Sequence, residues 1–394
     1  MNRTAWPIAL LSIWIIPFGT PSNVESFRQL ISTRYPSTGK LPTDFRRPTK
    51  NFDFVPKNRL PTNVTILSAA KAANGAVWVL TDKGPLRSLD TDGPYGPLEI
   101  GPRLLEPGQP RGNSDTQINE IVGDSLGHLW LATDQGVFIT DGKQWWQPLT
   151  RRDGVPFDSV QCIHLAPNGD VWGGTAEEGA WRLRDGHFRY FWGKRWLPGN
   201  RVKAIWSAKG GKVWVDTDAG LACLEEVPMT LAKKAEHYDA IVQKRHNLRG
   251  FIHAIKLKVP GDPTQESKLV VSANDGLWTS LYATAMSFRY ASTKSPEARR
   301  QARESINAVL DLERLSGIPG YPTRCLVRDE DIPTKLAPIN FKALVVGPED
   351  DSKIWFRSRI RPDLWCKGDT SSDALCGPYL AWYVYHDLVA NDAE

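Results

Sequence analysis

Three aspartates near the starts of predicted helices are the first candidates for chemistry in this sequence. Asp275 begins a segment with a helical pattern over 275–293, and Asp373 lies at the start of another over 372–391, with Asp369 four residues before it. A carboxylate acts as a general acid or base when burial raises its pKa. At the same places an aspartate can instead cap free backbone N–H groups and complement the helix dipole. Both interpretations, acid–base catalysis and helix capping, stay open for Asp275 and Asp373.

Arg245, His246 and Arg324 are the basic residues that such a site would use. Histidine transfers protons near neutral pH, and arginine binds a carboxylate or sulfate group through paired hydrogen bonds. Arg245 and His246 also lie near the end of a predicted helix over 231–249, where cations are favourable without any further role. For Arg324, which follows the rigid loop 317–322, a structural salt bridge is the alternative to substrate binding.

Three further residues complete the predicted substrate site: Asn274, Trp278 and Trp365. An indole ring offers a flat apolar face on which a sugar ring can stack. For Trp278 the alternative is packing in the core, because the helix that contains it has an amphipathic pattern. The apolar stripe of that helix consists of Leu277, Leu281, Ala285 and Phe288.

A short phrase, a glycine followed three residues later by a tryptophan, occurs four times in the first half of the chain. Its tryptophans are Trp78, Trp130, Trp172 and Trp214, so the period is 42 residues after a longer first interval. An alternating strand and a tight glycine turn precede the tryptophan in most units. Such a period with four short strands per unit predicts β-propeller blades. A tryptophan at the same place in every unit indicates packing between blades.

The last repeat lacks a fourth strand of its own, because Glu225–Pro228 leads out of the pattern. Phe52–Val55 precedes the first repeat by the spacing that separates a fourth strand from the next unit. We therefore predict that 52–55 supplies the missing strand and closes the ring, which removes exposed sheet edges. An incomplete larger ring is the alternative.

The repeat phrase resembles the two-component-regulator propeller repeat over about 52–228. This family of repeats occurs in bacterial periplasmic sensors and in some secreted proteins. The resemblance implies a β-propeller fold. It implies an extracellular sensor role only weakly, since one fold hosts many functions.

The second half of the chain resembles the helical half of secreted propeller-plus-toroid proteins and, more distantly, the six-hairpin glycosidase and polysaccharide lyase class. The residues that show the resemblance are Arg245–Asn247, Asn274–Thr279, Gly317–Gly320 with Arg324, and Gly368–Asp373. It implies an (α/α) toroid and acid–base cleavage of a glycan. The chain offers only part of the helices of a full ring, so apolar faces would be exposed and a partner could cover them. Ala374 and Gly377-Pro378 stand where the related pattern has an acid and a Gly-His pair, which points to a degenerate relative.

The N-terminus and the overall charge favour export of a protein that does not bind nucleic acid. Arg3 and the apolar run Ala5–Phe18 are typical of a signal peptide over 1–22, with an uncleaved anchor as the alternative. The net charge is only +5 over 394 residues, and no block of Lys and Arg occurs.

The five cysteines match no zinc-binding spacing, and we predict no metal and no cofactor. In an oxidising compartment Cys366 and Cys376, ten residues apart, are the favoured disulfide pair. Asn63 begins a glycosylation sequon, which matters only in a eukaryotic source.

The predicted fold class is a multidomain β + α protein in four segments. They are a signal peptide (1–22), an N-terminal linker (23–51), a small, about four-bladed β-propeller (52–228) and an incomplete (α/α) toroid (229–394). The leading hypothesis is a secreted or periplasmic protein that cleaves a neutral or acidic polysaccharide by glycosidase- or lyase-like chemistry.

Two other hypotheses remain, a non-catalytic ligand-, glycan- or protein-binding propeller and an extracellular sensor module. A binding propeller should expose aromatic side chains at its mouth, where we would expect Trp145, Trp146, Trp192 or Trp196.

Overall fold

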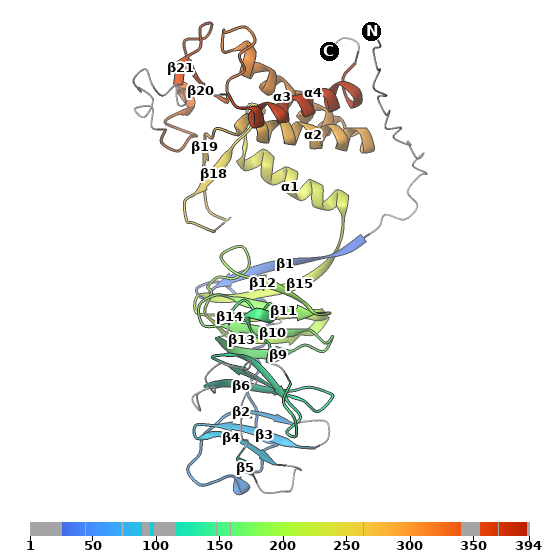
Figure 1. Cartoon of the computed structure of the whole chain (residues 1–394), viewed down its shortest axis with the longest axis vertical. Helices are drawn as coiled ribbons and strands as arrows, with labels where there is room; N and C mark the ends of the chain where they lie inside the picture. The colour runs from blue at the N-terminus through green and yellow to red at the C-terminus, as the bar shows by residue number, and fades with distance from the viewer. Residues whose placement is uncertain are drawn as a thin grey trace, which may run out of the picture.

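The computed structural model describes residues 26–391 except 44, 72–74, 89–94, 98–115, 147, 158, 263, 340–354 and 369. Figure 1 shows a stack of β-sheets at one end of the molecule and a helical part at the other. Among the described residues, no helix is long and apolar enough to cross a membrane.

Each of the four tryptophan repeats forms its own antiparallel sheet, which we call the first to fourth repeat sheets. The first contains β2 (Ile66–Lys71), β3 (Val77–Thr81), β4 (Gly84–Ser88) and β5 (Gly96–Pro97). The second contains β6 (Ile118–Gly123), β7 (Leu129–Thr133) and β8 (Gly136–Thr140). The third contains β9 (Val160–Leu165), β10 (Val171–Thr175), β11 (Ala180–Arg184) and β12 (His187–Phe191). The fourth contains β13 (Val202–Ala208), β14 (Lys212–Thr217), β15 (Gly220–Thr230) and β1 (Ser26–Pro36).

The predicted closing strand is wrong. The fourth repeat sheet is completed by β1, which pairs with β15 along its whole length, from Ser26 opposite Thr230 to Pro36 opposite Gly220. With this register, β1 supplies hydrogen-bond partners for the backbone of β15 along its whole length. A strand of only four residues at 52–55 is too short to do so. The segment predicted as a linker therefore contributes a strand to the β-rich part.

Phe52 and Val55 instead pack on the face of the first repeat sheet that contains Val77 and Val79. At the other end of the stack, Phe45 packs on the outer face of the fourth repeat sheet. Residues 35–60, which we call the N-terminal strap, thus cover the two terminal faces of the stack. The first and fourth repeat sheets lie at opposite ends of it, so their strands do not meet in a ring (Figure 1).

The repeated tryptophans fill the contacts between successive sheets, as the period predicts. Trp78 packs with residues of the second repeat sheet, Trp130 with the third, and Trp172 with the fourth. Among the described residues, no further repeat sheet packs against Trp214. Its ring lies against Tyr35 and Phe45 of the strap, at centroid distances of 5.5 and 4.9 Å.

In the residues that the structure describes, the helical part contains four α-helices, three small sheets and one short 3-10 turn. The helices are α1 (Leu231–Arg245), α2 (Asp275–Thr293), α3 (Pro296–Arg314) and α4 (Ser372–Leu388). Two hairpins follow α1, namely β16 (Asn247–Leu248) with β17 (Phe251–Ile252), and β18 (Ala254–Leu257) with β19 (Ser267–Val270). The third sheet contains β20 (Cys325–Arg328), β21 (Trp355–Arg357) and β22 (Leu364–Lys367). In the whole described chain the 3-10 turns are Lys57–Arg59, Arg151–Asp153, Lys209–Gly211 and Asp329–Asp331.

Helix α2 buries small side chains rather than its apolar stripe. Leu281 is 44% and Phe288 55% exposed. The buried face consists of Gly276, Thr279, Ser280, Ala283, Thr284, Met286 and Ser287. Its hydroxyls donate to backbone carbonyls one turn earlier, as Ser280 does to Gly276 at 2.7 Å. Small residues allow α3 and α4 to pack closely here, which leaves the larger apolar residues facing outward.

Candidate functional site

Arg324 brings together the N-termini of α2 and α4, as the sequence-based site requires. Its Nε donates to the Ala273 carbonyl and its Nη2 to the Ser371 hydroxyl, both at 3.0 Å. Asn274 is the N-cap residue of α2. Two predicted catalytic residues cannot be placed, because Asp369 and the side chain of Asp373 lie outside the part of the structure that is described.

Asp275 is completely buried, and hydrogen bonds occupy its carboxylate. One oxygen accepts from the Ser272 hydroxyl at 2.8 Å, and the other accepts from the Ser272 N–H and from His253 Nδ1, both at 3.0 Å. This arrangement ties the start of α2 to Ser272 and His253, and it differs from the expected capping because none of these donors belongs to the free N–H groups of α2. His253 is a buried polar residue that the sequence analysis missed, because no periodicity marks it.

His246 has a structural position at the end of α1. Its Nδ1 bonds to the His253 carbonyl at 2.8 Å, and its N–H continues the helix by donating to Val242 at 2.8 Å. Arg245 lies half-buried in the last turn of the same helix. The structure therefore places both at a helix end, which was the alternative to their roles in binding and catalysis.

The cavity beside Arg324, between the starts of α2 and α4, is too small for a sugar. A cavity lined by Gly276, Arg324, Thr370 and Ala374 has a volume of about 10 Å³, which is about the room needed for one water. Among the predicted acid–base and binding groups that the structure describes, only Arg324 lines this cavity.

The two predicted stacking residues lie on different elements. Trp278 is 43% exposed on the outer face of α2, not in the core. Trp365 on β22 donates through Nε1 to Asp329 at 3.0 Å, and the Arg357 guanidinium lies 3.9 Å from its ring centroid. Trp365 also packs against the cluster that contains Leu269, Val327 and Leu336.

The predicted disulfide is absent, and all five cysteines are free thiols. Cys366 is buried on β22, with its sulfur 4.0 Å from the Leu315 carbonyl, whereas Cys376 lies on the exposed face of α4. The ten-residue spacing suggested a disulfide across a loop, but one thiol lies on a buried strand and the other on the exposed face of a helix. Asn63 lies in an exposed turn, so its side chain is accessible.

We expect a single thiol of the native protein to react rapidly with a disulfide reagent, and all five to react after denaturation. The four other thiols are buried, and burial raises the pKa of Cys366 to about 11, so its thiolate is scarce at neutral pH. Stopped-flow thiol titration measures this, and Cys376→Ser should abolish the fast phase. Only three reactive thiols in denaturant without a reductant would instead show a disulfide.

A larger site that the sequence analysis missed lies on the outer face of the fourth repeat sheet. This end-sheet pocket has a volume of about 690 Å³. Its aromatic lining consists of Tyr35, Trp206 and Trp214, and its charged lining consists of Arg46, Lys209, Lys212 and Glu225. The pocket lies where a following sheet would pack, beside the strap residues Pro42 and Pro48.

The end-sheet pocket has an excess of positive charge. Glu225 is its one carboxylate among the described lining residues, and it pairs with Lys212 at 3.3 Å. Arg46 and Lys209 add two further cations to the lining. Nearby, Arg47 of the strap pairs with Asp216 at 3.0 Å, which holds the strap against the sheet.

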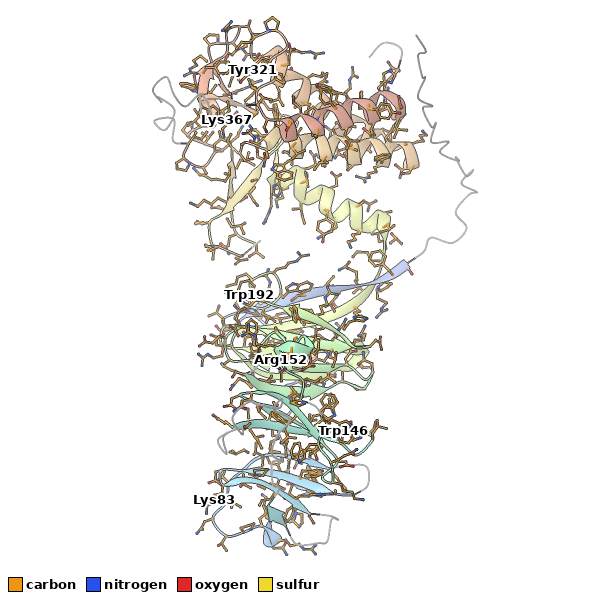
Figure 2. The ribbon with its side chains drawn as sticks, in the orientation of Figure 1. Lys83, Trp146, Arg152, Trp192, Tyr321 and Lys367 are labelled. Carbon is orange, nitrogen blue, oxygen red and sulfur yellow. The ribbon has the colours of Figure 1, made fainter. Side chains whose placement is uncertain are left out.

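The tryptophans expected at a propeller mouth do not gather at one place. Figure 2 shows Trp146 beside the lower sheets and Trp192 at the end of the stack nearest the helical part. Trp192 is 64% exposed. Trp145 and Trp196 are only partly buried but pack against cores of different sheets.

Comparisons with known proteins found no family and only limited similarity to solved structures. No protein-family model matches the chain, and no curated protein matches it in sequence. The extracellular domain of a putative one-component system from B. thetaiotaomicron is 18% identical, with 40% of this chain and 21% of that chain covered and a TM-score of 0.33. The extracellular domain of a putative hybrid two-component system from the same organism is 15% identical, with 53% of this chain and 27% of that chain covered and a TM-score of 0.32. A streptogramin B lyase is 18% identical over 42% of this chain and 54% of that chain, with a TM-score of 0.30. The chain thus spans about a quarter or less of the first two, and no activity follows from these similarities.

Proposed function

We propose that this chain is a secreted or periplasmic binding protein that holds an acidic saccharide in the end-sheet pocket. The observation that supports this most strongly is the position of Trp214. Its three equivalents pack against a following sheet, whereas Trp214 lies beside a pocket of about 690 Å³. The strap residues Tyr35 and Phe45 cover most of this face and leave Trp214 6% exposed, so we place the ligand in the pocket beside the strap, where it would complete the cover of the last repeat sheet.

The composition of the pocket favours a ligand with flat apolar faces and negative charge. Aromatic rings pack against the C–H faces of sugar rings, and the pocket offers the half-buried ring of Tyr35, with Trp206 and Trp214, 7% and 6% exposed, beneath it. Arg46 and Lys209 attract carboxylate or sulfate groups through charge-assisted hydrogen bonds. The volume falls within the range of about 300–1,000 Å³ that is typical of small-ligand sites.

Binding without cleavage fits the described side chains better than catalysis. Acid–base cleavage of a glycosidic bond by the usual routes needs two carboxyl groups on either side of the bond. The described lining of the pocket has only Glu225, which pairs with Lys212, and Asp275 is sealed in the helical part. The described lining therefore has the groups that binding needs, whereas cleavage by these routes would need a second carboxyl group.

Calorimetric titration with an oligogalacturonate and with a neutral cello-oligosaccharide of equal length tests the proposal. We expect the acidic ligand to bind, the neutral one to bind more weakly, and the acidic affinity to fall as salt screens the charges. Trp214→Ala should weaken binding at least about ten-fold, since stacking and burial on a tryptophan are lost. Trp192→Ala, an exposed tryptophan outside the pocket lining, is the matched control.

A second variant keeps the test independent of folding. Lys209 is exposed at the edge of the pocket, so Lys209→Glu should leave the fold intact and lower the affinity for the acidic ligand. Equal affinity for both saccharides, or no effect of Trp214→Ala and Lys209→Glu, would contradict the proposed function.

A further inference from the structure

A second cavity lies between the third and fourth repeat sheets. Its volume is about 230 Å³, whereas one water needs about 10–15 Å³ of such space. Its charged lining consists of Arg28, Asp170, Arg182, Arg184 and Glu226. This inter-sheet cavity lies on the opposite face of the fourth repeat sheet from the end-sheet pocket, because Val213 and Leu224 line the one while Trp214 and Cys223 line the other.

The two carboxylates of the inter-sheet cavity are already paired with arginines. Asp170 receives two hydrogen bonds from Arg184, through Nε and Nη2, both at 2.6 Å. Glu226 accepts at one oxygen from Arg182 Nη1 at 2.7 Å and from Arg184 Nη1 at 2.8 Å. Three arginines therefore face two carboxylates, and one positive charge remains in excess.

Arg182 retains donor capacity that no described residue uses. The residue is only 8% exposed, and its Nε is buried without a hydrogen-bond partner among the described residues. Trp172 Nε1, on the neighbouring strand β10, is also buried without a partner. Both N–H groups lie behind the cavity surface, so an acceptor in the cavity reaches Arg182 Nε only after a small movement of that side chain. Because an unpaired buried charged donor is costly, such a movement would be favourable when an acceptor is bound.

We propose that the inter-sheet cavity binds a small oxyanion, a carboxylate or a sulfate group, with Arg182 as its principal ligand. The excess positive charge, the unused N–H of Arg182 and the unfilled volume support this proposal together. An oxyanion would complete the hydrogen bonding of Arg182 and balance the charge between two sheets. The inference does not depend on the ligand of the end-sheet pocket.

Thermal unfolding in sodium acetate, sodium sulfate and sodium chloride at equal ionic strength tests this site. We expect acetate or sulfate to raise the unfolding temperature saturably, with chloride having no saturable effect. The oxyanion with the lower saturating concentration identifies the preferred group. Arg182→Gln should raise that concentration at least about ten-fold, because a charge-assisted hydrogen bond is lost. The matched control is Arg201→Gln, an exposed arginine that does not line the cavity.

Arg28→Gln provides the second variant if Arg182→Gln fails to fold. Arg28 lines the same cavity from β1, and its Nη2 donates to the Glu226 carbonyl in an exposed contact. Its replacement should weaken oxyanion binding by several-fold. The proposal would be overturned if the unfolding temperature rose linearly with both acetate and sulfate concentration. It would also be overturned if a saturable rise in the unfolding temperature survived both Arg182→Gln and Arg28→Gln.

Discussion

Asp275→Ala is expected to lower the free energy of unfolding of the helical part by about 3 kcal/mol, because buried donors would lose their acceptor. The carboxylate accepts from Ser272 N–H, the Ser272 hydroxyl and His253 Nδ1, and the residue is fully buried. Alanine would also leave a small void beneath the start of α2. Guanidinium unfolding followed by far-UV circular dichroism, to which the helices contribute most, measures the loss.

The control for Asp275→Ala is Asp387→Ala on the exposed side of α4, where the carboxylate contacts only the adjacent His386 among the described residues. Asp387→Ala should lower the free energy of unfolding by less than about 0.5 kcal/mol. If Asp275→Ala kept full stability and abolished a glycan-cleaving activity, the structural role assigned to Asp275 would be wrong and the catalytic interpretation would be restored.

Trp78→Ala is expected to lower the free energy of unfolding by about 3–5 kcal/mol, the usual range for truncating a buried aromatic side chain. Trp78 fills the contact between the first and second repeat sheets, and the Arg87 guanidinium lies 4.6 Å from its ring centroid. The same change at Trp214 should cost at least about 1 kcal/mol less, since only the strap covers that ring and the pocket beside it lets the site relax. Guanidinium midpoints and slopes for both variants measure the difference.

An equal loss at Trp78 and Trp214 would mean that Trp214 is packed as tightly as an interior repeat tryptophan. The end-sheet pocket would then be filled by protein in solution and could not take a ligand. A smaller loss at Trp214 together with lost saccharide binding would agree with the proposed function.

The sheets could be predicted from the sequence because the signal is local and repeated. Each unit contains its own turn glycine, such as Gly127 and Gly169 with positive φ, and its own tryptophan. Helix α2 was predicted with the bounds that the structure has, and Ser295 caps α3 locally by accepting a hydrogen bond from the Ala298 N–H. Such features depend on a few neighbouring residues.

The closing strand could not be predicted from spacing alone. Phe52–Val55 lies at the expected distance from the first repeat. Strand pairing, however, depends on which segment can form backbone hydrogen bonds with β15 over its whole length, and Ser26–Pro36 does so. The exposed stripe of α2 was misleading for a related reason. Periodicity identifies two faces, whereas close packing against α3 and α4 selects the face with small residues.

The end-sheet pocket had a sequence signal that could have been used. The repeat pattern ends after Trp214, so the fourth tryptophan has no following unit to pack against. The strap that frames the pocket gave no such signal, because Tyr35 and Phe45 lie in a segment without periodicity. His253 was missed for the same reason.

Hydrogen–deuterium exchange with and without an oligogalacturonate tests the central claim most directly. The ligand should protect peptides that cover residues 33–48 and 206–214, which line the end-sheet pocket, and leave the helical part unchanged. Protection around Asp275 and Arg324 in place of the fourth repeat sheet would contradict the proposed binding site.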